Sequence, residues 1–272
     1  MTKVYSINTC NFRLDGGAVF GVVPKTIWQN LHKPDERNRI VQALKVMLII
    51  DGDRKIIVDM GLGNWCSEKF VDQYAIENPD FDFNVPLGDF DLTTEDITDL
   101  VVTHLHFDHA GGLIRKTDSG IAPAFPDARI WIHKEHWAWA QNPSPKDSGN
   151  FLDNYIKFLQ DWPKLKLTEG QTQITDNVSL LPLFGHTPGM LTVLAKAEGQ
   201  IHFFASDIFP TASHLHIPYI MAYDNNPVLT SQEKVEILEK ACKENWLIYF
   251  PHDPVYDKGY VTKENGKYTI KK

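Results

Sequence analysis

The sequence predicts an α+β sandwich (αββα), in which two mixed β-sheets pack face to face and helices cover their outer faces. Two features of the chain lead to this prediction. Apolar, β-branched segments typical of strands occur in groups, and segments with helical spacing separate the groups. Polar residues suited to catalysis follow directly after several of these strands, which is the usual arrangement for a site built on loops above a rigid sheet.

The first strands form a hairpin. Residues 43–50 and 55–59 are apolar and β-branched, and they flank a polar turn that contains Gly52. A short helix is expected after Thr93, because Asp96 three residues later completes a capping box. This helix leads into a buried strand at residues 100–103.

The rest of the chain continues the alternation. A strand at residues 129–132 precedes a helix at 134–141, and apolar residues at helical spacing predict a further helix within 150–162. Three strand candidates follow, at residues 178–183, 190–195 and 201–205. Thr230 and Glu233 make a second capping box, which predicts a helix that runs to about residue 244, and residues 246–250 form the final strand.

Composition limits the class of protein. The chain has 272 residues and a net charge of −8, without the clustered Lys and Arg that a nucleic-acid surface requires. Its apolar runs are too short to span a bilayer, and it begins without the pattern of a secretory signal. The three cysteines are widely spaced and suggest no disulfide framework. We therefore expect a single cytoplasmic domain over residues 1–272, with no nucleic-acid or membrane partner.

The clearest functional signal lies at residues 104–109. Four potential metal ligands, His104, His106, Asp108 and His109, fall within six residues directly after a strand. Imidazole and carboxylate groups suit zinc, iron or manganese. In an extended start His104 and His106 point the same way, while Asp108 and His109 follow after the chain turns and can face a second ion. The sequence therefore predicts two adjacent metal ions.

This stretch resembles the signature of the metallo-β-lactamase-fold superfamily, His-X-His-X-Asp-His followed by glycines. Later segments match the superfamily in order: Gly-His-Thr-Pro-Gly around His186, an apolar strand that ends at Asp207, and a strand that ends before His252. Residues 56–61 resemble the opening strand and its structural aspartate, Asp59. The resemblance covers residues 43–253 and extends to the branch that contains lactonases and methyl parathion hydrolase.

The resemblance implies a role for each of these residues. His104, His106 and His186 would hold the first ion, Asp108, His109 and His252 the second, and Asp207 would bridge both. Two divalent ions are implied, zinc first among them, although manganese or iron would also suit this ligand set. The implied enzyme is a metal-dependent hydrolase in which a hydroxide that bridges the metals cleaves a small ester, lactone or phosphotriester. Asp108 is the expected catalytic proton acceptor.

The substrate pocket and the assembly are less closely constrained by the sequence. The segment after Asp207 is expected to form a pocket wall, with His214, His216 and Phe209 as candidate substrate contacts. The N-terminal residues 1–42 resemble an arm that covers the pocket or joins a dimer in relatives, so a homodimer is a further expectation. Pocket shape decides the small-molecule substrate in this superfamily, and the sequence leaves the physiological substrate open.

Two other functions remain as alternatives. The chain could be an iron-dependent redox member of the superfamily, or a binding protein that retains metals without catalysis. The complete set of seven candidate ligands favours two metals and hydrolysis over both.

Overall fold

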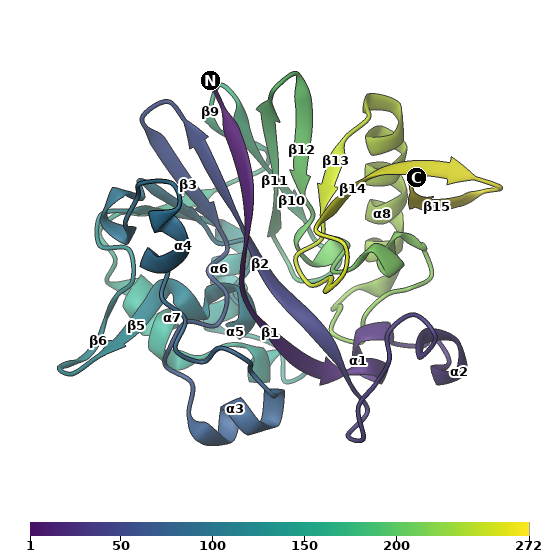
Figure 1. The fold of residues 1–272 in the computed structure, drawn as a ribbon, viewed down its shortest axis with the longest axis horizontal. Coiled ribbons are helices and arrows are strands. Elements are labelled where there is room, and N and C mark those ends of the chain that lie inside the picture. Colours follow the sequence, from purple (N-terminus) through teal and green to yellow (C-terminus); the bar gives the residue numbers. More distant parts are fainter. Residues whose placement is uncertain (272) are drawn as a thin grey trace.

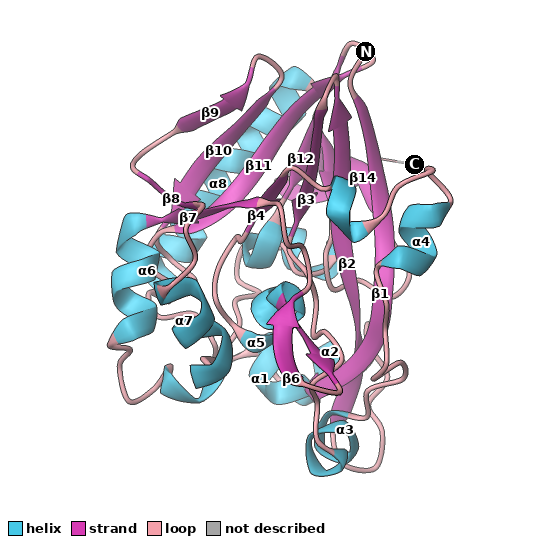
Figure 2. Ribbon diagram, turned by 90° about the vertical axis from the view of Figure 1, so that its left-hand side faces the viewer, coloured by secondary structure: helices cyan, strands magenta, loops and turns pink. Residues whose placement is uncertain are grey.

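The computed structural model describes residues 1–271, and it confirms the predicted α+β sandwich of two mixed sheets (Figures 1 and 2). Among these residues the first sheet has the strand order β1-β2-β3-β4-β7-β8. Strands β1 to β3 are antiparallel, whereas β3, β4, β7 and β8 run parallel. Its members are β1 (Lys3–Asp15), β2 (Arg39–Asp51), β3 (Arg54–Val58), β4 (Asp99–Val101), β7 (Arg129–His133) and β8 (Leu165–Thr168).

The second sheet has the order β15-β14-β13-β12-β11-β10-β9 among the described residues, and only its β12–β13 pair is parallel there. Its members are β9 (Thr172–Thr175), β10 (Val178–Leu183), β11 (Met190–Ala197), β12 (Gln200–Phe204), β13 (Leu247–Tyr249), β14 (Lys258–Glu264) and β15 (Lys267–Ile270). A separate hairpin consists of β5 (Ile114–Thr117) and β6 (Gly120–Pro123).

Alternation along the strands explains why the sheets pack as they do. In β2, Met47 and Ile49 face the second sheet, while Leu48 between them packs with residues on the outer side. In β12 the same alternation places Phe204 between the two sheets and Phe203 on the outer side, under α8. Each central strand is therefore apolar on both faces, and a layer of side chains joins the two sheets.

Helices cover the outer faces. Helices α6 (Lys134–Gln141) and α7 (Asp153–Gln160) pack on the first sheet, and α8 (Pro227–Glu244) packs on the second (Figures 1 and 2). The remaining short helices are α1 (Gly16–Phe20), α2 (Lys25–Trp28), α3 (Glu68–Tyr74), α4 (Asn84–Gly88) and α5 (Phe107–Ala110). Among residues 1–271, no helix combines the length and the apolar character needed to cross a bilayer.

Most predicted elements form within a few residues of the expected bounds. The β2–β3 hairpin closes with Asp51 opposite Arg54, and Gly52 takes the left-handed φ of +61° that the tight turn needs. Asp96 accepts a hydrogen bond from the Thr93 backbone, although the helix it starts is one 3-10 turn, Thr94–Asp96.

The predicted start of α8 is wrong. The helix begins at Pro227, and the Asn226 side chain caps it by accepting from the Leu229 backbone. Proline suits the first turn, because its missing N–H has no partner there in any case. Thr230 and Glu233 lie inside the helix, and Glu233 instead bonds to the turn that carries His186.

Only part of residues 1–42, the predicted N-terminal arm, extends away from the first sheet. Strand β1 pairs with β2 from Lys3 opposite Ile50 to Asp15 opposite Arg39, so it belongs to the first sheet. Helices α1 and α2 extend beyond the sheet, near the lower end of β1 in Figure 1. The Phe20 ring stacks on Trp28 and on His214, which ties this extension to the loop after β12.

Candidate metal centre

The segment of residues 104–109 lies at the end of β4 and forms one wall of the candidate centre. The chain is still extended at His106 and then enters α5, so that Asp108 and His109 lie in its first turn. This is the change of direction that the sequence predicts. All four side chains are buried.

Two glycines, Gly111 and Gly112, follow α5 directly. Neither Gly111 nor Gly112 has a positive φ. A Cβ atom at Gly111 would lie 2.3 Å from the Leu62 carbonyl oxygen, and one at Gly112 would lie 2.1 Å from the Met60 carbonyl oxygen. Glycine is therefore needed for close packing of two backbones, which holds α5 against the loop after β3.

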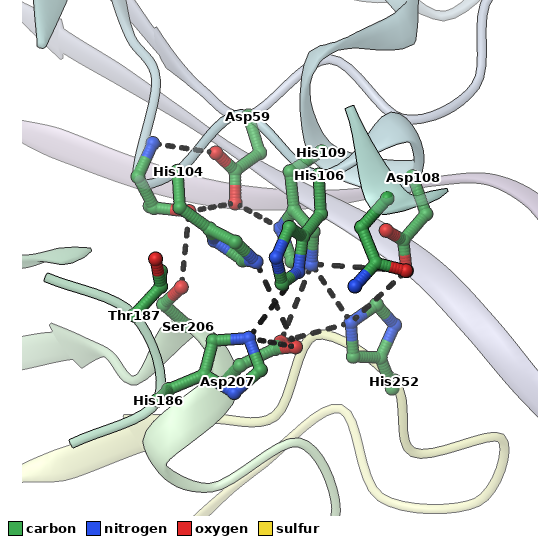
Figure 3. Close-up of polar contacts among 12 residues, drawn as sticks. Asp59, His104, His106, Asp108, His109, His186, Thr187, Ser206, Asp207 and His252 are labelled. Atoms are coloured by element: carbon green, nitrogen blue, oxygen red, sulfur yellow. Dashed lines mark hydrogen bonds and ion pairs between the residues drawn. The ribbon is translucent and has the colours of Figure 1, made fainter. Parts of the chain in front are cut away.

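The structure brings all seven predicted ligands together (Figure 3). They form three overlapping groups in which the potential ligand atoms lie within 4.8 Å of one another. The groups are His104, His106 and His186; His104, His109 and Asp207; and Asp108, His109 and His252. We call these seven residues the His/Asp cluster.

Asp207 is central in this cluster. Its Oδ1 lies 3.0 Å from His252 Nε2 and 3.3 Å from His109 Nε2, whereas its Oδ2 lies 3.4 Å from His186 Nε2 and 3.8 Å from His104 Nε2. The two oxygens of one carboxylate therefore face two different sets of histidines. Figure 3 shows Asp207 opposite the rings of His104, His106 and His109.

Three histidines of the cluster are oriented by buried carboxylates behind them. Asp147 Oδ1 lies 3.1 Å from His106 Nε2, Asp59 Oδ2 lies 2.8 Å from His109 Nδ1, and Asp224 Oδ1 lies 2.6 Å from His186 Nδ1. A ring N–H that donates to a carboxylate leaves the other nitrogen with a lone pair, which fixes the tautomer. His106 therefore presents Nδ1 to the cluster, and the other two present Nε2.

The other two histidines are oriented by uncharged oxygens. His252 Nδ1 donates to the Ala43 carbonyl at 2.9 Å. His104 Nδ1 lies 3.0 Å from Thr103 Oγ1, and because that hydroxyl donates to Asp59, it can accept from the His104 ring. All five histidines thus direct a free nitrogen toward Asp207 or toward one another.

The donor set fits a metal cation. His104 Nε2 is buried, and no residue in 1–271 provides it with a hydrogen-bond partner. His252 Nε2 and His109 Nε2 lie 3.1 Å apart, and His186 Nε2 and His106 Nδ1 lie 3.4 Å apart. Lone pairs that face one another in a buried site need a positive charge between them, and imidazole and carboxylate groups are common ligands of zinc.

The pKa shifts of residues in the His/Asp cluster also fit a bound metal cation. Burial lowers the pKa of His104 well below its usual value, and the neighbouring His109 and His106 lower it further. Burial acts in the same direction on His109, but Asp207, Asp108 and Asp59 outweigh it and raise the pKa of His109 well above its usual value. Although burial favours the protonated acid, His109 and His252 hold the pKa of Asp207 well below its ordinary range. A divalent cation can replace the proton that these groups would otherwise share.

Backbone strain occurs at two positions beside the cluster. Asp59 and Ser206 have φ values of +59° and +49°, a left-handed conformation that costs about 1–2 kcal/mol for such residues. Asp59 is held by the Thr103 backbone N–H, and Ser206 donates to Thr103 Oγ1 at 3.0 Å. Thr103 therefore links the ends of β3, β4 and β12, and Asp59 has the structural role that the sequence predicts.

The expected substrate contacts lie elsewhere. The His214 ring is buried between Thr211 Oγ1 and the Val19 carbonyl, at 2.8 and 3.0 Å, because it anchors the N-terminal extension. His216 borders an outer groove beside Tyr219 and β15, and Phe209 is buried in the core under α8. None of these three side chains lines the cavity above the cluster.

The cavity walls are only partly those expected, because Leu14 and Gln42 belong to the predicted N-terminal arm whereas Tyr74, Asn150, Met221 and Tyr223 lie in segments that the sequence did not indicate. Besides five members of the His/Asp cluster, its walls are Leu14, Gln42, Tyr74, Phe107, Asn150, Met221 and Tyr223. No Lys or Arg is among these lining residues. The sequence analysis missed the supporting residues Asp147 and Asp224, because neither directly follows a strand, and it assigned Glu233 to a capping box rather than to the turn that carries His186.

Comparison with known proteins supports this description. The family model described as the metallo-beta-lactamase superfamily matches residues 45–252. An N-acyl homoserine lactonase from Bacillus cereus is 28% identical over 170 residues, which cover 61% of this chain and 59% of that lactonase. The chain thus spans less than two thirds of the length of this relative. The N-acyl homoserine lactonase AiiB from Agrobacterium fabrum is 22% identical over 237 residues, 79% of this chain and 80% of that protein.

Solved structures share the fold over nearly the whole chain. A probable metal-dependent hydrolase from Staphylococcus aureus has a TM-score of 0.88 and 26% identity, and it covers 100% of this chain and 97% of its own. AidC, a dizinc quorum-quenching lactonase in complex with a product, has a TM-score of 0.81 and 18% identity, with coverage of 99% and 94%.

Proposed function

Because this chain belongs to the metallo-beta-lactamase superfamily, we propose that it is a metal-dependent hydrolase that opens small, uncharged lactones or esters. The observation that carries the proposal is the placement of Asp207, whose two oxygens face separate sets of histidines. A carboxylate in this position can span two ions about 3.5–4 Å apart.

We assign the ligands accordingly. His104, His106 and His186 would hold one ion, Asp108, His109 and His252 the other, and Asp207 would bridge them. Zinc is the first choice, because the donors are imidazole and carboxylate and a relative of the same fold is described as a dizinc lactonase. Such ions, when bound, would supply Lewis acidity, which polarises a carbonyl and makes a water acidic near neutral pH.

The residues around the centre would position the substrate and receive a proton. Asp108 lines the cavity, and its Oδ2 lies 3.8 Å from His109 Nε2 and 3.9 Å from His252 Nε2. We assign it the role of proton acceptor for the attacking water, in addition to that of ligand. Asp207 is held in its ionised form by the surrounding histidines, so it contributes charge rather than a proton.

The cavity walls favour an uncharged substrate. Leu14, Phe107 and Met221 provide apolar surface, and no basic side chain is present to pair with an anionic group. Lactones, aryl esters and phosphotriesters all meet this condition. Lactones rank first, because relatives named above are N-acyl homoserine lactonases. We further propose that residues 1–272 act as one domain, since a shared layer of side chains joins the two sheets.

Metal analysis together with a substrate screen tests the proposal. We expect two zinc ions per chain and turnover of at least one lactone, aryl ester or phosphotriester. Asp207→Ala should lose metal and at least about 100-fold in kcat/KM, while the circular dichroism spectrum is unchanged. Full activity of a metal-depleted Asp207→Ala protein would refute the proposal. A single iron with oxygen consumption would support the redox alternative, and bound metal without turnover would support the binding-protein alternative.

A further inference from the structure

Two tyrosines line the cavity above the His/Asp cluster, and they are its only side chains with a neutral O–H group among the described residues. Tyr74 comes from the end of α3, and its ring packs against Phe70 and Phe107 at centroid distances of 4.6 and 5.1 Å. Tyr223 comes from the loop before α8, and its ring packs against the cluster of Val19 and Phe20. The two rings therefore approach the centre from different segments.

The hydroxyl of Tyr223 has no internal role. Within residues 1–271 it takes part in no hydrogen bond, although the ring is half-buried. The hydroxyl of Tyr155, by contrast, donates to the Leu105 carbonyl at 2.7 Å and is structural. A buried phenol normally finds a partner, so a free hydroxyl that borders a cavity is available to a ligand.

Burial and nearby charges keep the hydroxyl of Tyr223 protonated. Burial raises the pKa of Tyr223, and the carboxylates of Asp108 and Asp207 raise it further. Burial and Asp108 raise the pKa of Tyr74 in the same way. The phenol of Tyr223 is therefore protonated at neutral pH, so its O–H can donate a hydrogen bond to a ligand in the cavity.

The backbone at Tyr223 is fixed relative to two proposed ligands. Lys146 Nζ donates to the carbonyls of Tyr223 and Asp224, at 2.9 and 3.2 Å. Asp224 holds His186, while Asp147, next to Lys146, holds His106. Asn225 joins the two loops by donating to Asp147 Oδ2 at 3.0 Å. The same contacts that orient the histidines thus position Tyr223.

We propose that Tyr223 is a catalytic residue that donates a hydrogen bond from its phenol to the carbonyl oxygen of the scissile ester. This role rests on the proposed function. In the reaction the water oxygen bonds to the carbonyl carbon and the bond from that carbon to the leaving oxygen breaks. One water proton passes to the leaving oxygen and the other leaves the new carboxylic acid for solvent. Tyr223 keeps its proton throughout and stabilises the negative charge that develops on the carbonyl oxygen.

Tyr223→Phe in the zinc-loaded protein tests the role, with Tyr256→Phe as the matched control, because the Tyr256 ring is 49% exposed and does not line the cavity. Loss of one such donor typically costs about 100-fold in kcat, so Tyr223→Phe should lose about this factor with KM changed less than about threefold. The loss should be similar for a lactone and for a 4-nitrophenyl ester, because both develop charge on the carbonyl oxygen. Tyr256→Phe should stay within about twofold of the unmodified protein. Zinc content and melting temperature should be equal in all three proteins.

A binding measurement does not depend on turnover. Calorimetric titration with N-hexanoyl-L-homoserine, a product in which the former lactone carbonyl is a carboxylate, should show about tenfold weaker binding to Tyr223→Phe, and no change for Tyr256→Phe.

The outcomes separate the two proposals. An active protein whose Tyr223→Phe variant keeps both kcat and product affinity would overturn the role of Tyr223 and leave the proposed function intact. A loss confined to the lactone would also overturn it, because the hydrogen bond would then act on the leaving oxygen. If the protein shows no turnover but Tyr223→Phe still weakens product binding, the proposed hydrolase function would be rejected. The contact between Tyr223 and the product would then stand. Absence of both binding and turnover would reject both.

Discussion

At the scale of single residues, each histidine of the His/Asp cluster uses one ring nitrogen for a hydrogen bond to the protein and presents the other to the site. Asp224 has the simplest contact of the supporting carboxylates, since its side chain bonds to His186 Nδ1 alone among residues 1–271. Because this contact sets the tautomer and the ring angle of His186, metal affinity should depend on a residue that does not touch the metal.

Asp224→Asn tests this dependence. The amide can still accept from the ring but carries no charge, so we expect zinc affinity to fall about 10- to 100-fold. Competition with a chromophoric chelator measures the affinity. Asp153→Asn is the control, since that side chain is 96% exposed on α7. Equal affinity in both variants would show that Asp224 has no part in metal binding.

Lys234 is a second residue whose environment leads to a testable prediction. Its Nζ donates to the carbonyls of His216, Ile217 and Tyr219. Burial lowers the pKa of Lys234 to about 7, with a small opposing influence from Asp224, whereas an unfolded lysine titrates near 10.5. Between pH 7 and 10.5 the unfolded chain therefore binds more protons than the folded one, and stability rises with pH.

From this difference we expect the contribution of Lys234 to the free energy of unfolding to rise by about 2 kcal/mol between pH 7 and pH 9. Lys234→Met removes the titrating group, so its stability should be less dependent on pH over this interval even if it is lower throughout. Urea unfolding of both proteins at the two pH values measures the difference. Parallel pH profiles would mean that the buried amine does not titrate in this range.

At the scale of elements, the turn that carries His186 depends on helix α8. Glu233 accepts from the backbone N–H groups of Phe184 and Gly185, at 2.7 and 3.0 Å. A Cβ at Gly185 would lie 2.4 Å from Thr230 Oγ1, so glycine is needed for this turn to touch the helix. The capping-box pattern of Thr230 and Glu233 thus marks a contact between α8 and the site rather than the start of the helix.

Glu233→Gln should weaken this contact, because the two backbone N–H groups bond to different carboxylate oxygens and the amide NH2 of glutamine would face one of them as a second donor. We expect a loss of about 1–3 kcal/mol in stability and a measurable loss of zinc affinity through His186. Asn226→Ala is the matched variant, since it removes the side-chain cap of the same helix at a cost of about 1 kcal/mol and leaves the backbone hydrogen bond from residue 226 to the Gly185 carbonyl in place. Equal zinc affinity in these two variants would contradict the coupling.

At the scale of the whole molecule, the His/Asp cluster draws on both sheets. His104, His106, Asp108 and His109 follow β4 of the first sheet, whereas His186, Asp207 and His252 follow β10, β12 and β13 of the second. Bound metal would therefore link the two halves of the sandwich, and the folded state would gain stability from any ion that the unfolded chain binds weakly.

Removal of metal should lower the melting temperature of the whole chain in one transition. Zinc at a concentration of about 100 times its dissociation constant adds about 2.7 kcal/mol per site to the free energy of unfolding. This stability should be recovered when zinc is added back to the apo protein. Differential scanning calorimetry with and without a chelator measures the shift. A chelated protein with an unchanged melting temperature would argue against a metal that joins the sheets.

The sequence by itself determined the sandwich, about half of the strand positions and the ligand group at residues 104–109, because these depend on local periodicity and on short spacing. His186, Asp207 and His252 were identified through the resemblance to the superfamily. Only the tertiary structure decided what surrounds them. Asp147 and Asp224 reach His106 and His186 from 41 and 38 residues away, and Tyr223 enters the cavity while His214 turns to the N-terminal extension. Such contacts depend on how loops from different elements pack together, and a single sequence carries no periodic signal for that packing.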